Sequence, residues 1–216
     1  MSAPKIVLSF PHYWSAKILS ARPAILPARH FTYPNEAEEV ERGALEVLVR
    51  PESERLGAPS FPRRLQEGWE NRDPDVPSPM LQPFLATCAL GFKDPAVPAG
   101  IWSTPNPDEL CAISGGYAYI IDTTAPEKFT MLPYRPVLQV RPIPEHNLLI
   151  FIGHHAILAW GADDEAWQSP KLSDEGVTIT TVEGSLLHGL GWNLITDKET
   201  PFALDLRTGT LISATP

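Results

Sequence analysis

Apolar and polar residues alternate in three similar stretches in the second half of the chain, and each stretch reaches a glycine. A leucine near the start of each stretch recurs every 38 residues, at Leu110, Leu148 and Leu186. A glycine recurs with the same spacing, at Gly115, Gly153 and Gly191. The stretches alternate or carry β-branched residues, and none keeps a helical period over three turns. The pattern predicts an all-β protein with an internal repeat.

Each repeat is expected to hold four short strands of a meander. The first strand ends at the glycine, and the others carry AYII or AILA, KFTM or AWQS, and VLQV or VTIT. The third unit has extra residues at NLITDKETP and ends before a fourth strand. We expect ALEVLVR (residues 44–50) to complete it, and FLATCALGF (84–92) to fill another partial unit. An open two-sheet β-sandwich built from the same pieces is the alternative.

A four-stranded unit of about 38 residues resembles a blade of a β-propeller. The resemblance covers residues 98–216 and implies a ring that closes by borrowing a strand from the other terminus. The Trp-Asp signature of WD40 blades is absent from these residues. The run AILAWGADDEAW…LSDEGVTIT also resembles an uncharacterised bacterial family of all-β proteins, and that likeness implies no activity.

The first 97 residues are predicted to be an irregular, proline-rich segment with a few strands packed on the core. The chain has 24 prolines among 216 residues, and proline interrupts both helices and sheet ladders. One short helix is expected near residues 61–69, and one helical turn or an acidic loop at residues 36–43. We expect residues 98–216 to hold the repeated units, and the whole chain to form one structural domain.

Charge and composition narrow the classes of partner. The net charge of −9 disfavours nucleic acid, which needs clustered basic residues, whereas Arg63-Arg64 is the sole basic doublet. Cys88 and Cys111 lie in apolar runs and are predicted to be buried, reduced thiols. The first apolar run, residues 6–10, is too short for a signal peptide or a membrane span. These features predict a cytoplasmic protein without a membrane partner.

A candidate ligand site follows from the repeat. If the units fan round an axis, the equivalent residues Tyr117, His155 and Asn193 converge at one mouth, with His154 and Trp192 beside them. Such a group can hold a small polar ligand by stacking and hydrogen bonding, and His155 would be its general base. Adjacent histidines in a strand point to opposite faces, so no metal site is expected, and the sequence indicates no cofactor. The acidic opposite edge, with Asp163 to Glu165, lacks the register of a calcium loop.

The leading interpretation is a non-catalytic binding or protein-interaction module for a protein or a small molecule. The alternative is an enzyme, a small-molecule hydrolase with its site on the Tyr117/His155/Asn193 rim. A third interpretation makes the chain a subunit whose short ring is completed by a partner. Fold class alone does not choose among these functions.

Overall fold

The computed structural model describes residues 4–35, 42–56 and 82–212, and in these the protein is all-β. The described residues contain one 3-10 helical turn, η2 (Pro144–His146), and no α-helix. The strands are β1 (Lys5–Val7), β2 (His12–Leu19), β3 (His30–Tyr33), β4 (Ala44–Leu56), β5 (Phe84–Ala89), β6 (Gly100–Ser103), β7 (Glu109–Ser114), β8 (Tyr117–Asp122), β9 (Phe129–Met131), β10 (Gln139–Ile143), β11 (Leu148–Ile152), β12 (Ile157–Trp160), β13 (Glu165–Gln168), β14 (Val177–Glu183), β15 (Leu186–Asn193) and β16 (Lys198–Asp205).

These strands form four separate sheets. The first sheet has the strand order β2-β4-β5-β3, and the second has the order β1-β6-β7-β8-β9. The third sheet is the meander β10-β11-β12-β13, and the terminal sheet is the three-stranded meander β14-β15-β16. Most pairs are antiparallel, but β3 runs parallel to β5 and β1 runs parallel to β6.

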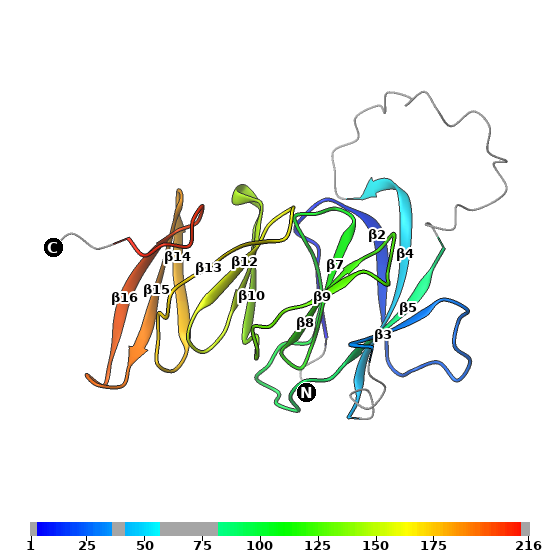
Figure 1. Ribbon diagram of the computed structural model, residues 1–216, viewed down its shortest axis with the longest axis horizontal. Coiled ribbons are helices and arrows are strands. Elements are labelled where there is room, and N and C mark those ends of the chain that lie inside the picture. The colour runs from blue at the N-terminus through cyan, green and yellow to red at the C-terminus, as the bar shows by residue number, and fades with distance from the viewer. Residues whose placement is uncertain (1–3, 36–41, 57–81, 213–216) are drawn as a thin grey trace, which may run out of the picture.

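The four sheets stand side by side in a row, from the first sheet to the terminal sheet (Figure 1). A separate apolar cluster fills each of the three spaces between neighbouring sheets. The second and third sheets are therefore covered on both faces. Strand β11, LLIFI, shows the consequence in its sequence: all five residues are buried, and it has no polar face.

Tryptophan side chains tie neighbouring sheets together by hydrogen bonds. Trp14 of the first sheet donates its Nε1–H to the carbonyl oxygen of Glu109 at 3.0 Å. Trp160 of the third sheet donates to the Glu109 carboxylate, also at 3.0 Å. Trp167 donates to the carbonyl oxygen of Leu206, just after β16, at 2.7 Å. The second sheet is thus bonded through Glu109 to both of its neighbours.

The boundaries of the expected units are wrong by one strand. The segments VLQV and VTIT were assigned to the end of a unit, but β10 and β14 each begin the following sheet. Nor does ALEVLVR complete the third unit: it lies in β4, in the first sheet, at the other end of the row. FLATCALGF, which was expected to fill another partial unit, supplies β5 of the same sheet. The two-sheet sandwich is also wrong, because the described strands already form four sheets.

The third copy of the recurring glycine lies in a different local structure. Gly115 and Gly153 follow β7 and β11 in their hairpin turns, whereas Gly191 lies inside β15. The extra residues of the third unit lengthen this hairpin, so β15 runs on to Asn193 and β16 starts at Lys198. The helices expected near residues 36–43 and 61–69 fall outside the described residues, except for the last two residues of the first segment.

Candidate functional site

The two adjacent histidines lie in the turn between β11 and β12, and both are exposed. Their ring centroids are 6.0 Å apart. The turn is closed by the Tyr134 hydroxyl, which donates to the carbonyl oxygen of Ala156 and accepts from the amides of Gly153 and Ala156 at 3.1 and 3.2 Å. His155 Nδ1 lies 3.2 Å from the carbonyl oxygen of Ser173. The histidine backbone is therefore a structural link to the loop before β14.

Tyr117 is directed away from these histidines. Along β8, Ala118 and Ile120 pack in the cluster shared with the third sheet, while Tyr117 and Tyr119 pack toward the first sheet. The Tyr117 ring meets Phe92 edge-on at 5.8 Å, and the Arg135 guanidinium lies 5.1 Å from its centroid. Tyr117 and His155 therefore face different spaces between sheets.

Trp192 and Asn193 do not join the other predicted site residues either. Residues alternate across β15, so Trp192 lies on the face opposite to Leu187, which packs against the third sheet. Asn193 Oδ1 accepts from the amides of Ile195 and Thr196, both at 3.0 Å, and so shapes the hairpin turn. The structure does not gather the five predicted side chains into one pocket.

The acidic edge opposite the histidine turn includes Glu109, whose carboxyl group is partly buried. Burial raises the pKa of Glu109, and hydrogen bonds from Trp160 and Thr104 oppose that rise. Asp163, Asp164 and Glu165 are exposed in and after the turn that follows β12. Among the described residues, no group of three or more His, Cys, Asp or Glu side chains is arranged to hold a metal ion.

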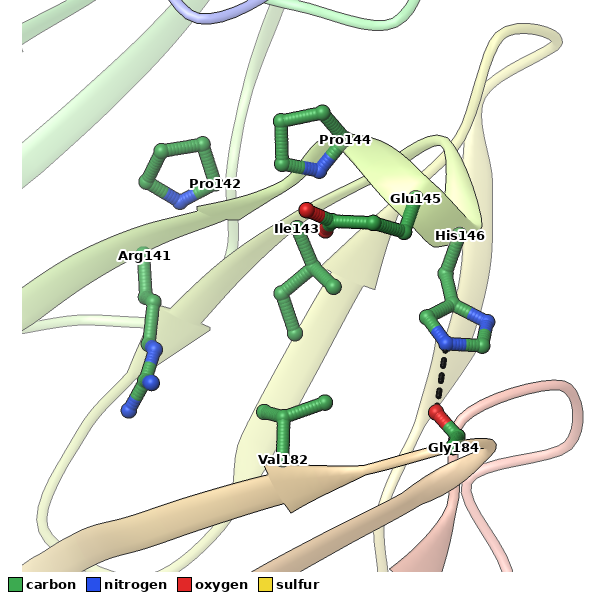
Figure 2. Close-up of a pocket in the computed structure, with 8 residues that line it drawn as sticks. All are labelled: Arg141, Pro142, Ile143, Pro144, Glu145, His146, Val182 and Gly184. Carbon is green, nitrogen blue, oxygen red and sulfur yellow. Dashed lines mark hydrogen bonds between the residues drawn. The ribbon is translucent and has the colours of Figure 1, made fainter.

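A groove lies between the third sheet and the terminal sheet, at the ends of β10 and β14 (Figure 2). His146 Nε2 lies 2.7 Å from the carbonyl oxygen of Gly184, and this hydrogen bond joins the two sheets across one end of the groove. Figure 2 shows Arg141 at the other end and Ile143 opposite Val182 between them. The eight residues lining it are Arg141, Pro142, Ile143, Pro144, Glu145, His146, Val182 and Gly184. They include no hydroxyl or thiol side chain.

The two faces of the terminal sheet differ in what covers them. Its inner face packs on the third sheet through Leu187, Leu204 and Val177. Its outer face, which we define by the residues of opposite parity, carries a stripe of apolar side chains around one histidine. These residues are Leu186, His188, Leu190, Trp192, Pro201 and Ala203; the same face carries Glu199 and Asp205 toward the ends of β16, and Thr178, Thr181 and Glu183 on β14. No sheet of the described chain covers this face (Figure 1).

Strand β15 places its larger apolar side chains on the outer face. Its inner positions include Gly189 and Gly191, where the neighbouring sheet elements come so close that a side chain would collide. A Cβ at Gly189 would lie 2.3 Å from the Phe202 ring, and a Cβ at Gly191 would lie 2.0 Å from the carbonyl oxygen of Leu172. A sheet face that met only water would be expected to carry polar residues. β15 instead has the composition of a strand covered on both faces.

Leu186, Leu190 and Trp192 on this face are half-buried, and exposed apolar residues lie around it. Among the described residues, four of the eight exposed large hydrophobic side chains lie between residues 194 and 212. They are Leu194 (61% exposed), Ile195 (93%), Leu211 (47%) and Ile212 (40%). Ile212 donates its amide to the carbonyl oxygen of Ala203, so the chain after β16 runs along the edge of the same sheet. Large exposed apolar patches mark interaction surfaces.

The sequence contained a signal for this surface. In LLHGLGWN the bulky residues Leu186, Leu190 and Trp192 share one parity, while the opposite parity holds two glycines. That asymmetry indicates which face of β15 carries the larger apolar area. The 38-residue spacing, in contrast, predicted a site at the turns. The outer face is the candidate functional site.

The structure also describes the two cysteines. Cys88 and Cys111 are free and buried, as predicted, and burial raises the pKa of each thiol, which makes both unreactive. Within the three described ranges, no helix has the length and apolar character needed to cross a membrane. No protein-family model, curated protein or solved structure matches the chain, so its function is argued from the outer face itself.

Proposed function

We propose that the chain is a non-catalytic protein-interaction module of propeller-like architecture, and that the outer face of the terminal sheet is its contact surface. The partner is a protein that presents an apolar sheet face of its own. The observation that carries the proposal is the two-sided apolar character of β15 in a sheet that has one neighbour. Face-to-face packing of sheets already builds every core in this molecule, and the proposed contact continues the row.

A propeller-like arrangement accounts for the open end. The outermost strands β9 and β13 are each followed by the first strand of the next sheet, as in successive blades of a propeller. Among the described residues the row is open, because no further sheet lies beyond the terminal sheet. A partner sheet on the outer face would extend the row and remove apolar surface from water. Full burial of one large apolar side chain contributes about 1.5–3 kcal/mol.

The edge of β16 is a poorer contact surface than the face. The backbone positions of β16 that point away from β15 include Ala203 and Asp205, and both already bond to residues 210–212. Pro201 has the same parity and has no N–H to donate to an added strand. A partner strand would therefore find few free partners on this edge. The contact is expected to use side chains of the face.

Replacing Leu190 by threonine tests this assignment. Leu190 lies on the outer face, so Leu190→Thr should change the free energy of unfolding by no more than about 1 kcal/mol in dilute solution. The matched control is Leu187→Thr in the same strand, which removes a fully buried side chain and should cost about 2–4 kcal/mol. Chemical denaturation measures both values.

The same variants show whether the face is open to a partner. Dilute wild-type protein should bind the apolar dye 8-anilinonaphthalene-1-sulfonate, and the double variant Leu190→Thr/Trp192→Thr should bind much less. The proposal would be contradicted if Leu190→Thr were as destabilising as Leu187→Thr, or if the double variant bound the dye as well as the wild type. Either result would mean that the face is already covered.

A further inference from the structure

We infer that the sheet which packs on the outer face belongs to a second copy of this chain, related by a two-fold axis that lies in the interface and crosses the strands above Gly189 and Phe202. This inference rests on the proposed function and names its partner. It predicts a closed dimer with a continuous row of eight sheets. An interface of this kind uses the same patch on both copies.

The first support is the arrangement of side chains about that row. Gly189 and Phe202 are opposite one another in the β15–β16 register. Leu186 and Trp192 lie three residues to either side of Gly189, and His188 and Leu190 lie one residue to either side. A two-fold axis above this row places the large Trp192 ring against the smaller Leu186 of the second copy. Large and small apolar side chains that alternate across an interface pack without voids.

The second support is the charge at the ends of β16. Glu199 and Asp205 lie three residues to either side of Phe202, so the axis brings Glu199 to the Asp205 end of the second copy. Asp205 is already held by Arg207, with its guanidinium NH2 nitrogen 2.9 Å from Oδ2, and the Arg207 side chain is 73% exposed. Arg207 has further donors directed at solvent. In the dimer these donors face Glu199 of the second copy. Within the described residues of one chain, Glu199 forms no ion pair.

The area of the outer face indicates how strongly two copies should bind each other. Eight residues at about 3.3 Å and three strands about 4.8 Å apart give a sheet of roughly 26 Å by 14 Å. The chain at Leu211 and Ile212 extends it along β16. This is a small interface by the standard of specific complexes, so we expect a dissociation constant on the order of micromolar.

Sedimentation velocity of the full chain over concentrations from about 0.1 to 100 µM tests the inference. The wild type should pass from monomer to dimer with no larger species, because the patch is self-complementary and closes on itself. Trp192→Glu should weaken the dimer by at least about 30-fold, since tryptophan is a typical hot-spot residue and a charge in its place would be buried. Thermal unfolding of the dilute variant shows that it still folds.

The charge contact gives a second, independent test. Arg207→Glu should dissociate the dimer, because three carboxylates would then meet at each end of β16. Adding Glu199→Arg to that variant should restore the dimer, since the new arginine would face Asp205 and the introduced glutamate of the second copy. The control is Lys17→Glu, an equal change of charge on β2 of the first sheet, which should leave association unchanged.

A wild-type chain that stays monomeric at about 100 µM would overturn the inference, and so would open-ended oligomers or a failed rescue. Dye binding then separates the two proposals. A monomer that binds the dye through Leu190 and Trp192 would keep the interaction module and require a different protein as partner. A monomer that binds no dye would remove both.

Discussion

Replacing Trp14 by alanine should destabilise the protein by about 3–5 kcal/mol and lower its melting temperature by roughly 10 °C or more. The Trp14 side chain is fully buried between the first and second sheets and contributes to their shared cluster. The substitution removes that volume and also the hydrogen bond to the carbonyl oxygen of Glu109. Differential scanning calorimetry with chemical denaturation measures both quantities.

The control for this experiment is Trp192→Ala, a loss of the same side chain from the outer face. In dilute solution it should cost clearly less than Trp14→Ala, because no second sheet packs over Trp192 in the single chain. Equal costs would contradict the row of sheets as described. Trp14→Phe should fall between the wild type and Trp14→Ala, since the ring still fills most of the space but donates no hydrogen bond.

Replacing Gly191 by alanine should also be strongly destabilising, by about 2–3 kcal/mol, even though alanine adds only one methyl group. The new Cβ would lie 2.0 Å from the carbonyl oxygen of Leu172 and 3.2 Å from Ser173. The loop at Leu172 can move away only if its backbone hydrogen bonds are disturbed. The Leu172 amide donates to the carbonyl oxygen of His155 at 2.7 Å, and the Asp174 amide donates to the carbonyl oxygen of Trp192 at 2.8 Å. Urea denaturation measures the loss.

Gly161→Ala is the matched control for that substitution. Its Cβ would meet Ala166 at 3.5 Å and the carbonyl oxygen of Asp164 at 3.6 Å, which are ordinary contacts. We expect a change of less than about 1 kcal/mol. If Gly191→Ala were as mild as Gly161→Ala, the close approach of the loop before β14 to β15 would be wrong.

Much of the strand content could be predicted from the sequence, because it depends on local pattern. The runs that became β7, β11 and β12 are short and apolar, and glycines or polar turns end them. Which sheet a strand joins is a long-range property. β10 follows one meander and precedes the next, so its sequence suits both assignments, and the tertiary pairing with β11 decided between them.

The predicted site failed for a related reason. The repeat correctly put Tyr117 and His155 close to the corresponding turns of their hairpins, but position along a strand does not fix the face to which a side chain points. Residues one position apart along a strand point to opposite faces of the sheet. Tyr117 stands at a position that points toward the first sheet. The ring-closing role expected of residues 44–50 failed because β4 pairs with its own neighbours β2 and β5.

The outer face was accessible to sequence analysis only in part. The parity of Leu186, Leu190 and Trp192 is plain in the sequence, but the absence of a covering sheet among the described residues is a property of the assembled row. Sequence alone could not tell whether the sheet of β15 was inside the row or at its end. The structure places β15 in the middle of the sheet at the end of the row, with the composition of a strand in an interior sheet.

Hydroxyl-radical footprinting of the dilute chain, read residue by residue by mass spectrometry, tests most directly whether the outer face is uncovered. We expect strong labelling of Trp192, Leu190 and Leu186, and little labelling of Leu187 and Leu204 on the inner face of the same strands. Equal protection of both faces would contradict the account, because it would show that the terminal sheet is already covered on both sides in the single chain.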